Sequence, residues 1–230
     1  MSIDTVIFDL DGVILDTEQV WHTVRRDFAL AHGGHWDERD QPAVMGANSM
    51  QWAAYMREQS GVDLSDQEIY AAVIGALREW YARDLPLVPG AREAIVGLAS
   101  EYRLGVASSS PRELIEDALE LAGVRAYFEA VVSSDEVPRG KPAPDVYLEA
   151  CARLGASPRR SAAVEDSSNG MQAAAEAGLA VIAVPNSDFP PSTDAMRAAD
   201  LVLGSIAELT AEVVASLRPR EERRGGDGGR

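Results

Sequence analysis

Apolar residues gather in short runs that recur along most of the chain, separated by longer amphipathic stretches. The runs, rich in Val, Ile and Ala, cover residues 5–10, 104–109, 130–134, 161–166, 179–185 and 200–204. Continuous apolar runs of this length are typical of strands buried on both faces. Strands that alternate with helical patterns predict right-handed βαβ crossovers. The pattern therefore predicts an α/β fold built on a doubly wound parallel sheet.

Several of the intervening helices have ends that are readable in the sequence. A Ser with a Glu three residues later predicts a capped N-terminus, and a Gly after the last apolar position predicts a C-terminus. The predicted N-caps are Ser110 with Glu113 and Ser205 with Glu208; the predicted terminal glycines are Gly123, Gly155 and Gly178.

Residues 17–85 break the alternation, because they contain no good strand pattern. They hold amphipathic helical stretches at 17–32, 48–59 and 65–83, and Ser65 with Glu68 forms a capping box for the last. We therefore expect a Rossmann-like core formed by residues 1–16 and 86–217, with an all-helical cap inserted at 17–85. The charged, glycine-rich segment 218–230 is expected to be a disordered tail.

Composition narrows the class of partner. The 230 residues carry a formal net charge of -16, which argues against a nucleic-acid partner. No apolar stretch reaches the length of a membrane span, and no signal peptide is visible. The one cysteine, Cys151, cannot form an internal disulfide and reads as a small core residue, so cytoplasm is the expected compartment. A monomer is the default expectation.

Polar side chains follow the ends of several predicted strands. Asp9 and Asp11 end the first, Ser108 and Ser109 the second, and Glu165 and Asp166 a later one, while Lys141 lies in the loop "RGKPAPD". In open α/β sheets the ligand crevice lies beyond these carboxyl ends. Clustered carboxylates suit a hard cation such as Mg²⁺, and a lysine with helix N-termini suits a phosphate. A metal would also relieve the repulsion between neighbouring carboxylates.

Four segments in this order resemble the motifs of the haloacid dehalogenase superfamily, in the phosphatase and phosphomutase branch with a helical cap after the first motif. They are "DLDGVILDT" (9–17), "ASSS" (107–110), "KPAPD" (141–145) and "VEDSSNG" (164–170), and the similarity runs from about residue 3 to about 215. The resemblance implies a phosphoric monoester hydrolase with Mg²⁺ as its cofactor and a small phosphorylated metabolite as its substrate.

The resemblance also implies roles for the residues in these motifs. Asp9 would be the nucleophile that becomes an aspartyl-phosphate, and Asp11 the general acid and base. Ser108, Ser109 and Lys141 would bind the phosphoryl oxygens. The metal would be held by Asp9, the backbone carbonyl of Asp11, and Asp166, with Glu165 bound directly or through water. Dehalogenases of the superfamily lack an aspartate at the position of Asp11, which argues against dehalogenation.

Two enzyme functions stay open from the sequence: a sugar-phosphate phosphatase and a β-phosphoglucomutase-type phosphomutase. The cap and core residues that serve the mutase are matched here by Trp21, Ser49 and Pro111, none of which carries a positive charge. The sequence therefore favours the phosphatase. A binding protein on an inactive scaffold is a third reading, but every motif side chain is present. Trp21 is either cap core or pocket wall, and Trp21 and Asn48 are the candidates for substrate selection.

Overall fold

The computed structural model describes residues 2–45, 47–186 and 189–220. Its centre is a parallel sheet with the strand order β3-β2-β1-β4-β5-β6. Each strand coincides with one of the predicted apolar runs: β1 Thr5–Phe8, β2 Arg103–Ser108, β3 Ala130–Ser133, β4 Ser161–Glu165, β5 Ala180–Ala183 and β6 Leu201–Val202. The strand order reverses direction at β1, so the doubly wound α/β fold predicted from the sequence is confirmed.

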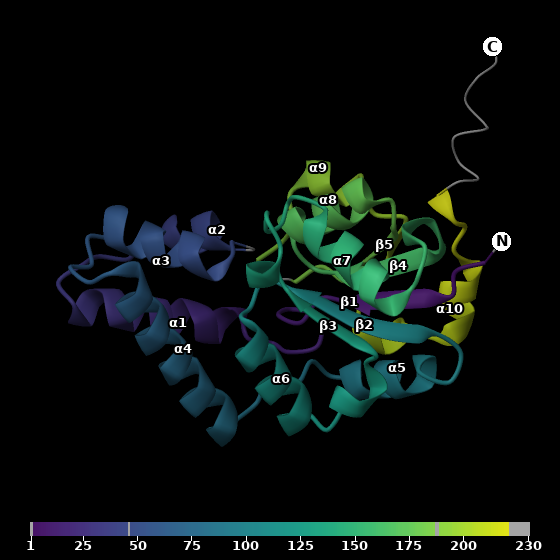
Figure 1. The fold of residues 1–230 in the computed structure, drawn as a ribbon, viewed down its shortest axis with the longest axis horizontal. Coiled ribbons are helices and arrows are strands. Elements are labelled where there is room, and N and C mark those ends of the chain that lie inside the picture. Colours follow the sequence, from purple (N-terminus) through teal and green to yellow (C-terminus); the bar gives the residue numbers. More distant parts are fainter. Residues whose placement is uncertain (1, 46, 187–188, 221–230) are drawn as a thin grey trace, which may run out of the picture.

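Helices cover both faces of this sheet, and Figure 1 shows them around it. One face packs on α5, α6 and α10, and the other on α7 and α8. Side chains of β1 alternate between these two cores, with Val6 and Phe8 on one side and Ile7 on the other. The helices of the core are α5 Ala91–Leu98, α6 Arg112–Leu121, α7 Asp145–Leu154, α8 Ser168–Ala177, α9 Thr193–Met196 and α10 Ala211–Ser216, with short 3₁₀ turns at Arg125–Tyr127, Ser134–Glu136, Pro158–Arg160 and Ile206–Glu208.

Two of the predicted helix starts are wrong. Pro111, not Ser110, occupies the N-cap of α6, and the hydroxyl of Ser110 is used elsewhere. Ser205 caps a 3₁₀ turn, while Thr210 caps α10. A capping box read from the sequence does not say whether a hydroxyl has a stronger partner in the folded protein.

The other predicted helix ends are confirmed. Ser65 and Glu68 form the capping box of α4. The three glycines expected at helix C-termini all adopt positive φ.

The cap consists of α1 Glu18–Ala31, α2 Asp40–Val44, α3 Ser49–Glu58 and α4 Asp66–Arg83. These helices lie apart from the sheet, at the left of Figure 1. The sequence did not predict α2, because five residues with a proline carry no helical period. Trp52, Met56 and Leu77 of the cap are almost fully buried, and they belong to the same apolar cluster as one face of the sheet.

The two chain crossings between cap and core run side by side. The amide of Asp16 donates to the carbonyl of Pro86 at 2.8 Å, and that of Val88 donates to Ile14 at 3.0 Å. An isolated bridge pairs Leu15 with Leu87. The insertion therefore begins and ends at one point beside the carboxyl end of β1.

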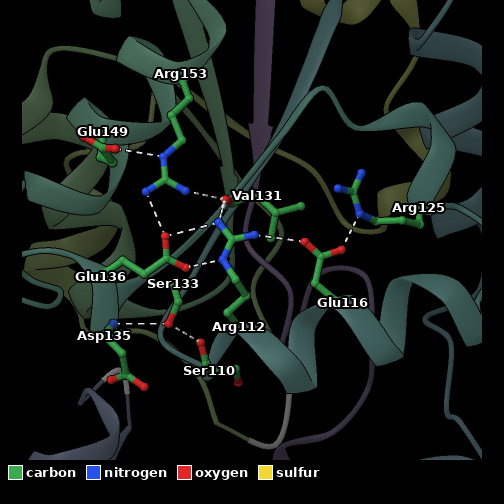
Figure 2. Close-up of polar contacts among 10 residues, drawn as sticks. All are labelled: Ser110, Arg112, Glu116, Arg125, Val131, Ser133, Asp135, Glu136, Glu149 and Arg153. Atoms are coloured by element: carbon green, nitrogen blue, oxygen red, sulfur yellow. Dashed lines mark hydrogen bonds and ion pairs between the residues drawn. The ribbon is translucent and has the colours of Figure 1, made fainter.

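β3 lies at one edge of the sheet, and its free carbonyl groups need partners. The carbonyl of Val131 accepts hydrogen bonds from Arg112 of α6 and Arg153 of α7. Glu136 lies between the two guanidinium groups and pairs with both, as Figure 2 shows. This network covers the edge strand with charge.

The ordered chain extends beyond the predicted boundary of the tail. Pro219 is buried, and the guanidinium of Arg220 donates to the carbonyls of Ala175 and Ala198 and to the carboxylate of Asp200. The disorder expected from residue 218 onward is therefore wrong for 218–220, and the rest of that segment lies outside the described residues. Among the described helices, none is long and apolar enough to span a membrane.

Candidate active site

The carboxyl ends of β1 and β4 bring the first carboxylates together. Phe8 is in register with Val164, so Asp9 and Glu165 leave neighbouring strands at the same level. The amide of Asp9 still donates to the carbonyl of Val164, at 3.0 Å. Lys141 reaches between the two strands: its Nζ lies 2.6 Å from Asp9 Oδ1 and 2.6 Å from Glu165 Oε1. The cluster therefore rests on strand ends that hydrogen bonds hold in place.

Burial controls the electrostatics of this cluster. Desolvation raises the pKa of Asp9 to about 8, although Lys141 acts in the opposite direction. Burial alone would lower the pKa of Lys141, but Asp9 and Glu165 outweigh it and raise that pKa. Tyr147 donates its hydroxyl to Glu165 Oε1 at 2.7 Å, which gives this carboxylate a second partner. Lys141 therefore remains a cation in the folded protein.

The acidic side chains fit a divalent metal ion. Asp9, Glu165 and Asp166 each offer an oxygen within 4.8 Å of the others. Asp166 Oδ2 is buried without a hydrogen-bond partner among the described residues, and burial with the nearby Glu165 raises the pKa of this carboxyl well above its usual range. A set of hard oxygen donors with one oxygen unsatisfied is what Mg²⁺ requires.

Two glycines leave room for these carboxylates. A Cβ at Gly12 would lie 1.9 Å from Asp166 Oδ2, and one at Gly170 would lie 1.8 Å from Glu165 Oε1. Gly12 also has φ +84°, which disfavours any other residue. The glycine that follows Asp11 in the sequence is thus required by the acidic cluster.

Asp11 has different surroundings from Asp9. Its Oδ1 accepts hydrogen bonds from the hydroxyl of Thr17 at 2.5 Å and the indole N–H of Trp21 at 3.0 Å, and its Oδ2 accepts from Ser110 at 2.7 Å. The hydroxyl of Tyr81 lies 3.5 Å from Oδ1. Donors from the cap segment therefore hold Oδ1 of this carboxylate, and a donor from the core holds Oδ2.

The serines after β2 form a third wall. Ser108 is fully buried, and its Oγ accepts from the amide of Ser110 at 3.0 Å. Ser133 at the end of β3 donates to the carbonyl of Ser110 at 2.7 Å, a contact drawn in Figure 2. Hydrogen bonds from the neighbouring strand thus fix the turn that presents Ser109 to the cavity.

One cavity of about 50 Å³ joins these groups. Most of the residues predicted for the site line it: Asp9, Asp11, Ser108, Ser109, Lys141, Asp166 and Trp21. Glu165 lies directly behind, bonded to Lys141. Asn48 is not among the lining residues; its side chain caps α3 by accepting from the amide of Gln51.

The cap closes the cavity from above and is bonded to the core on both sides. Ser49 donates its amide and hydroxyl to Asp135 at 2.9 and 2.5 Å, and Asn169 donates to the carbonyl of Met45 at 2.9 Å. A volume of about 50 Å³ is far below the roughly 300–1,000 Å³ of an ordinary ligand pocket. A substrate larger than a phosphate therefore enters only if the cap moves.

Sequence reasoning missed several residues of the site. Glu18, Arg25 and Trp52 line the cavity from the cap, and Ser110 lines it from the core. A signal was present, because Thr17, Trp21 and Arg25 are spaced four apart and so share one face of a helix. Nothing in the sequence alone says that this face is turned toward Asp11.

The protein-family comparison agrees with this geometry. The family model described as haloacid dehalogenase-like hydrolase matches residues 6–184, which includes the cap and all four motif segments. The chain belongs to this family. The resemblance read from the motifs is confirmed at the level of the family.

Curated relatives and solved structures cover nearly the whole chain. Hexitol phosphatase B of Escherichia coli (strain K12) is 35% identical over 212 residues, 90% of this chain and 94% of that protein. The phosphorylated carbohydrates phosphatase of Thermotoga maritima is 30% identical over 177 residues, 76% and 82% of the two chains. The crystal structure of CbbY from Rhodobacter sphaeroides in complex with phosphate superimposes with a TM-score of 0.82, at 28% identity, and covers 94% of this chain and 100% of that one.

Proposed function

We propose that the protein is a Mg²⁺-dependent phosphatase that hydrolyses a small phosphate monoester, a sugar phosphate, through an aspartyl-phosphate intermediate. The observation that carries the proposal is the separation of two aspartates. Asp9 faces Lys141 and the acidic cluster, while Asp11 is held by Trp21 of the cap and Ser110 of the core. This separation supports a role for Asp9 in the attack on phosphorus and for Asp11 at the leaving group.

The first step forms a bond between a carboxylate oxygen of Asp9 and phosphorus, while the bond from phosphorus to the ester oxygen breaks. Asp11 gives its proton to that leaving oxygen. In the second step Asp11 takes a proton from water, and the water oxygen attacks phosphorus and releases Asp9 and inorganic phosphate. The short D-x-D spacing allows Asp9 to attack phosphorus while Asp11 transfers the proton.

The remaining residues neutralise charge. Lys141, Ser108 and Ser109 bind the oxygens of the transferring phosphoryl group. Asp9, Asp166 and the backbone carbonyl of Asp11 would hold Mg²⁺, with Glu165 bound directly or through water. The ion supplies the positive charge that lets an anionic carboxylate approach a phosphate dianion.

The relatives support the reaction and the substrate class. The similar proteins from Escherichia coli and Thermotoga maritima are named as phosphatases of hexitols and of phosphorylated carbohydrates. Selection would fall to the cap, in which Trp21 lines the cavity and Asn48 supports the start of α3.

The phosphomutase alternative gains no support at the three positions compared in the sequence. Trp21 donates to Asp11, Ser49 binds Asp135, and Pro111 caps α6. None of them presents a cation to a second phosphate. Conversion of β-glucose 1-phosphate into glucose 6-phosphate, faster than release of inorganic phosphate, would favour the mutase instead.

The test is hydrolysis of p-nitrophenyl phosphate with Mg²⁺, with excess chelator, and with Mg²⁺ restored. We expect activity, its loss, and its recovery. A panel of sugar and nucleotide monophosphates then ranks the substrates by kcat/KM. Full activity in chelator would contradict the metal assignment, and no release of phosphate from any ester would contradict the phosphatase.

A further inference from the structure

A buried arginine of the cap faces the cavity without a hydrogen-bond partner for its Nε. Arg25 is 5% exposed and lines the cavity together with Asp9, Asp11 and Lys141. Among the described residues no hydrogen-bond partner is found for Nε. Burying a guanidinium group without filling its donors is costly, so a partner is expected in the working state of the site.

Among the described residues, Arg25 contacts two aromatic rings, and these contacts leave its Nε without a hydrogen-bond partner. Its guanidinium carbon lies 4.3 Å from the ring centre of Trp21 and 5.2 Å from that of Trp52. Aromatic faces stabilise a cation but accept none of its hydrogen bonds in the plane of the group. The two indoles therefore orient the guanidinium group but do not satisfy its Nε.

Glu18 is the carboxylate that competes for this role. Its charge attracts Arg25, which lies on the same helix, but its own side chain accepts from Gln41 at 3.3 Å, and no ion pair with Arg25 occurs within 4.0 Å among the described residues. Burial lowers the pKa of Arg25 to about 10, so the group is still a cation at neutral pH. The attraction between Glu18 and Arg25 therefore does not give Nε of Arg25 a hydrogen-bond partner.

Trp21 fixes where on the substrate Arg25 acts. The indole N–H of Trp21 donates to Asp11, and its ring lies against Arg25. Arg25 is therefore one indole away from the carboxylate that serves the leaving oxygen. We propose that Arg25 binds a second anionic group, a carboxylate or a phosphate, carried by the leaving-group part of the substrate, and so selects doubly anionic phosphate esters. This inference rests on the proposed phosphatase function and narrows its substrate class.

Charge makes this selection sharp. Among the described residues that line the cavity, Arg25 and Lys141 are the basic side chains, and Arg25 is the one that the cap contributes. A second anion in the leaving-group part of the substrate would therefore have Arg25 as its cationic partner. Neutral polyol groups gain much less from it, because charged hydrogen bonds are the stronger ones.

The experiment compares matched ester pairs that differ in one anionic group. The pairs are 3-phosphoglycerate with glycerol 3-phosphate, for a carboxylate, and fructose 1,6-bisphosphate with fructose 6-phosphate, for a phosphate. The ratio of kcat/KM within each pair is measured for the unmodified protein, Arg25→Met, Arg25→Lys and the control Arg26→Met. Arg26 is the next residue of α1, and its partner is the exposed Asp27.

We expect the unmodified protein to prefer the anionic member of at least one pair, and the pair identifies the anion. Arg25→Met should reduce that ratio by about 10- to 100-fold, the worth of a charged hydrogen bond. Arg25→Lys should keep part of the preference, and Arg26→Met all of it. The ratio of kcat/KM within a pair does not depend on the fraction of folded enzyme. A less stable variant therefore still gives a valid ratio.

Two results overturn the inference: preference of the unmodified protein for the neutral member of both pairs, or a ratio that Arg25→Met leaves unchanged. Failure of the proposed function looks different, because p-nitrophenyl phosphate would then also resist hydrolysis. In that case, calorimetric titration measures the affinities for 3-phosphoglycerate and glycerol 3-phosphate, and these affinities test the role of Arg25. Equal affinities in the unmodified protein and Arg25→Met would overturn the anion site as well.

Discussion

The two walls of the cavity are built in different ways. The core wall consists of polar side chains at strand ends, and Lys141 binds both Asp9 and Glu165 at 2.6 Å. The cap wall comes from helices, with aromatic faces and the guanidinium group of Arg25. A parallel sheet fixes its strand ends through hydrogen bonds on both sides, whereas the chain joins the cap to the core through two adjacent crossings, and a few side-chain hydrogen bonds hold the two together. We infer that the core wall holds the chemistry and the cap wall selects the substrate.

Among the tests of this division between chemistry and selection, Asp9→Asn should have the largest effect. It removes the proposed nucleophile together with one ligand of the metal, so hydrolysis of every ester should fall below detection. Steady-state assays on p-nitrophenyl phosphate and a sugar phosphate measure this. The control is Asp27→Asn, which changes an exposed carboxylate of α1 and should keep full activity. Retained turnover in Asp9→Asn would move the nucleophile elsewhere.

Asp11→Asn should separate substrates by their leaving group. Acid–base assistance is worth about 10²–10⁴-fold, and a sugar alkoxide needs it more than p-nitrophenolate does. The loss in the first step should therefore be larger for the sugar phosphate. Dephosphorylation should also slow, so mass spectrometry after rapid quench should find phosphate on Asp9. An unmodified rate on the sugar phosphate would reduce Asp11 to a residue that shapes the turn.

Trp21→Phe tests whether a cap residue acts on the chemistry. The sequence makes Trp21 a candidate for substrate selection. A change there would then alter the preference among substrates more than the turnover of an artificial ester. The structure instead places its N–H 3.0 Å from Asp11 Oδ1, so we expect a loss of about tenfold on every substrate. The control is Trp36→Phe in the cap core, whose buried indole nitrogen has no described partner. A loss of activity confined to large substrates would instead indicate that Trp21 selects the substrate.

The core wall should also make stability depend on pH and Mg²⁺. Because burial raises the pKa of Asp9 to about 8, the folded metal-free protein binds a proton that the unfolded chain releases near pH 4. Its free energy of unfolding should therefore fall as the pH rises from about 4 to about 8. Mg²⁺ binds the ionised form, so the gain in Tm on adding Mg²⁺ should widen from about pH 5 to about pH 8. A gain independent of pH in scanning fluorimetry would contradict this.

The smallest effect concerns the end of the chain, far from both walls. A chain ending at Leu217 loses the hydrogen bonds of Arg220 to the carbonyls of Ala175 and Ala198, so Tm should fall by a few degrees. A chain ending at Arg220 loses a segment without apolar residues and should keep the Tm and the rate. Equal Tm values for the two truncated chains would show that Arg220 contributes nothing.

The sequence by itself determined the sheet, the presence of a helical cap and the acidic residues of the core wall. Each strand is a continuous apolar run, and the polar residues directly after a buried strand must emerge at its carboxyl end. Asp9, Ser108 and Asp166 could therefore be named from their place beside such runs, and the family motifs supplied Lys141.

Only the tertiary structure decided what the cap contributes. The face of α1 that carries Trp21 and Arg25 looks in the sequence like any apolar face with one charge, and α2 is too short to show a period. The partner of the Ser110 hydroxyl is likewise undecided locally: in a capping box it would accept from the amide of Glu113, but in the structure it donates to Asp11, 99 positions away. Local patterns fix strands and caps through near neighbours, whereas contacts between cap and core depend on how the two pack. That packing makes Arg25, whose Nε has no hydrogen-bond partner among the described residues, part of the cavity wall.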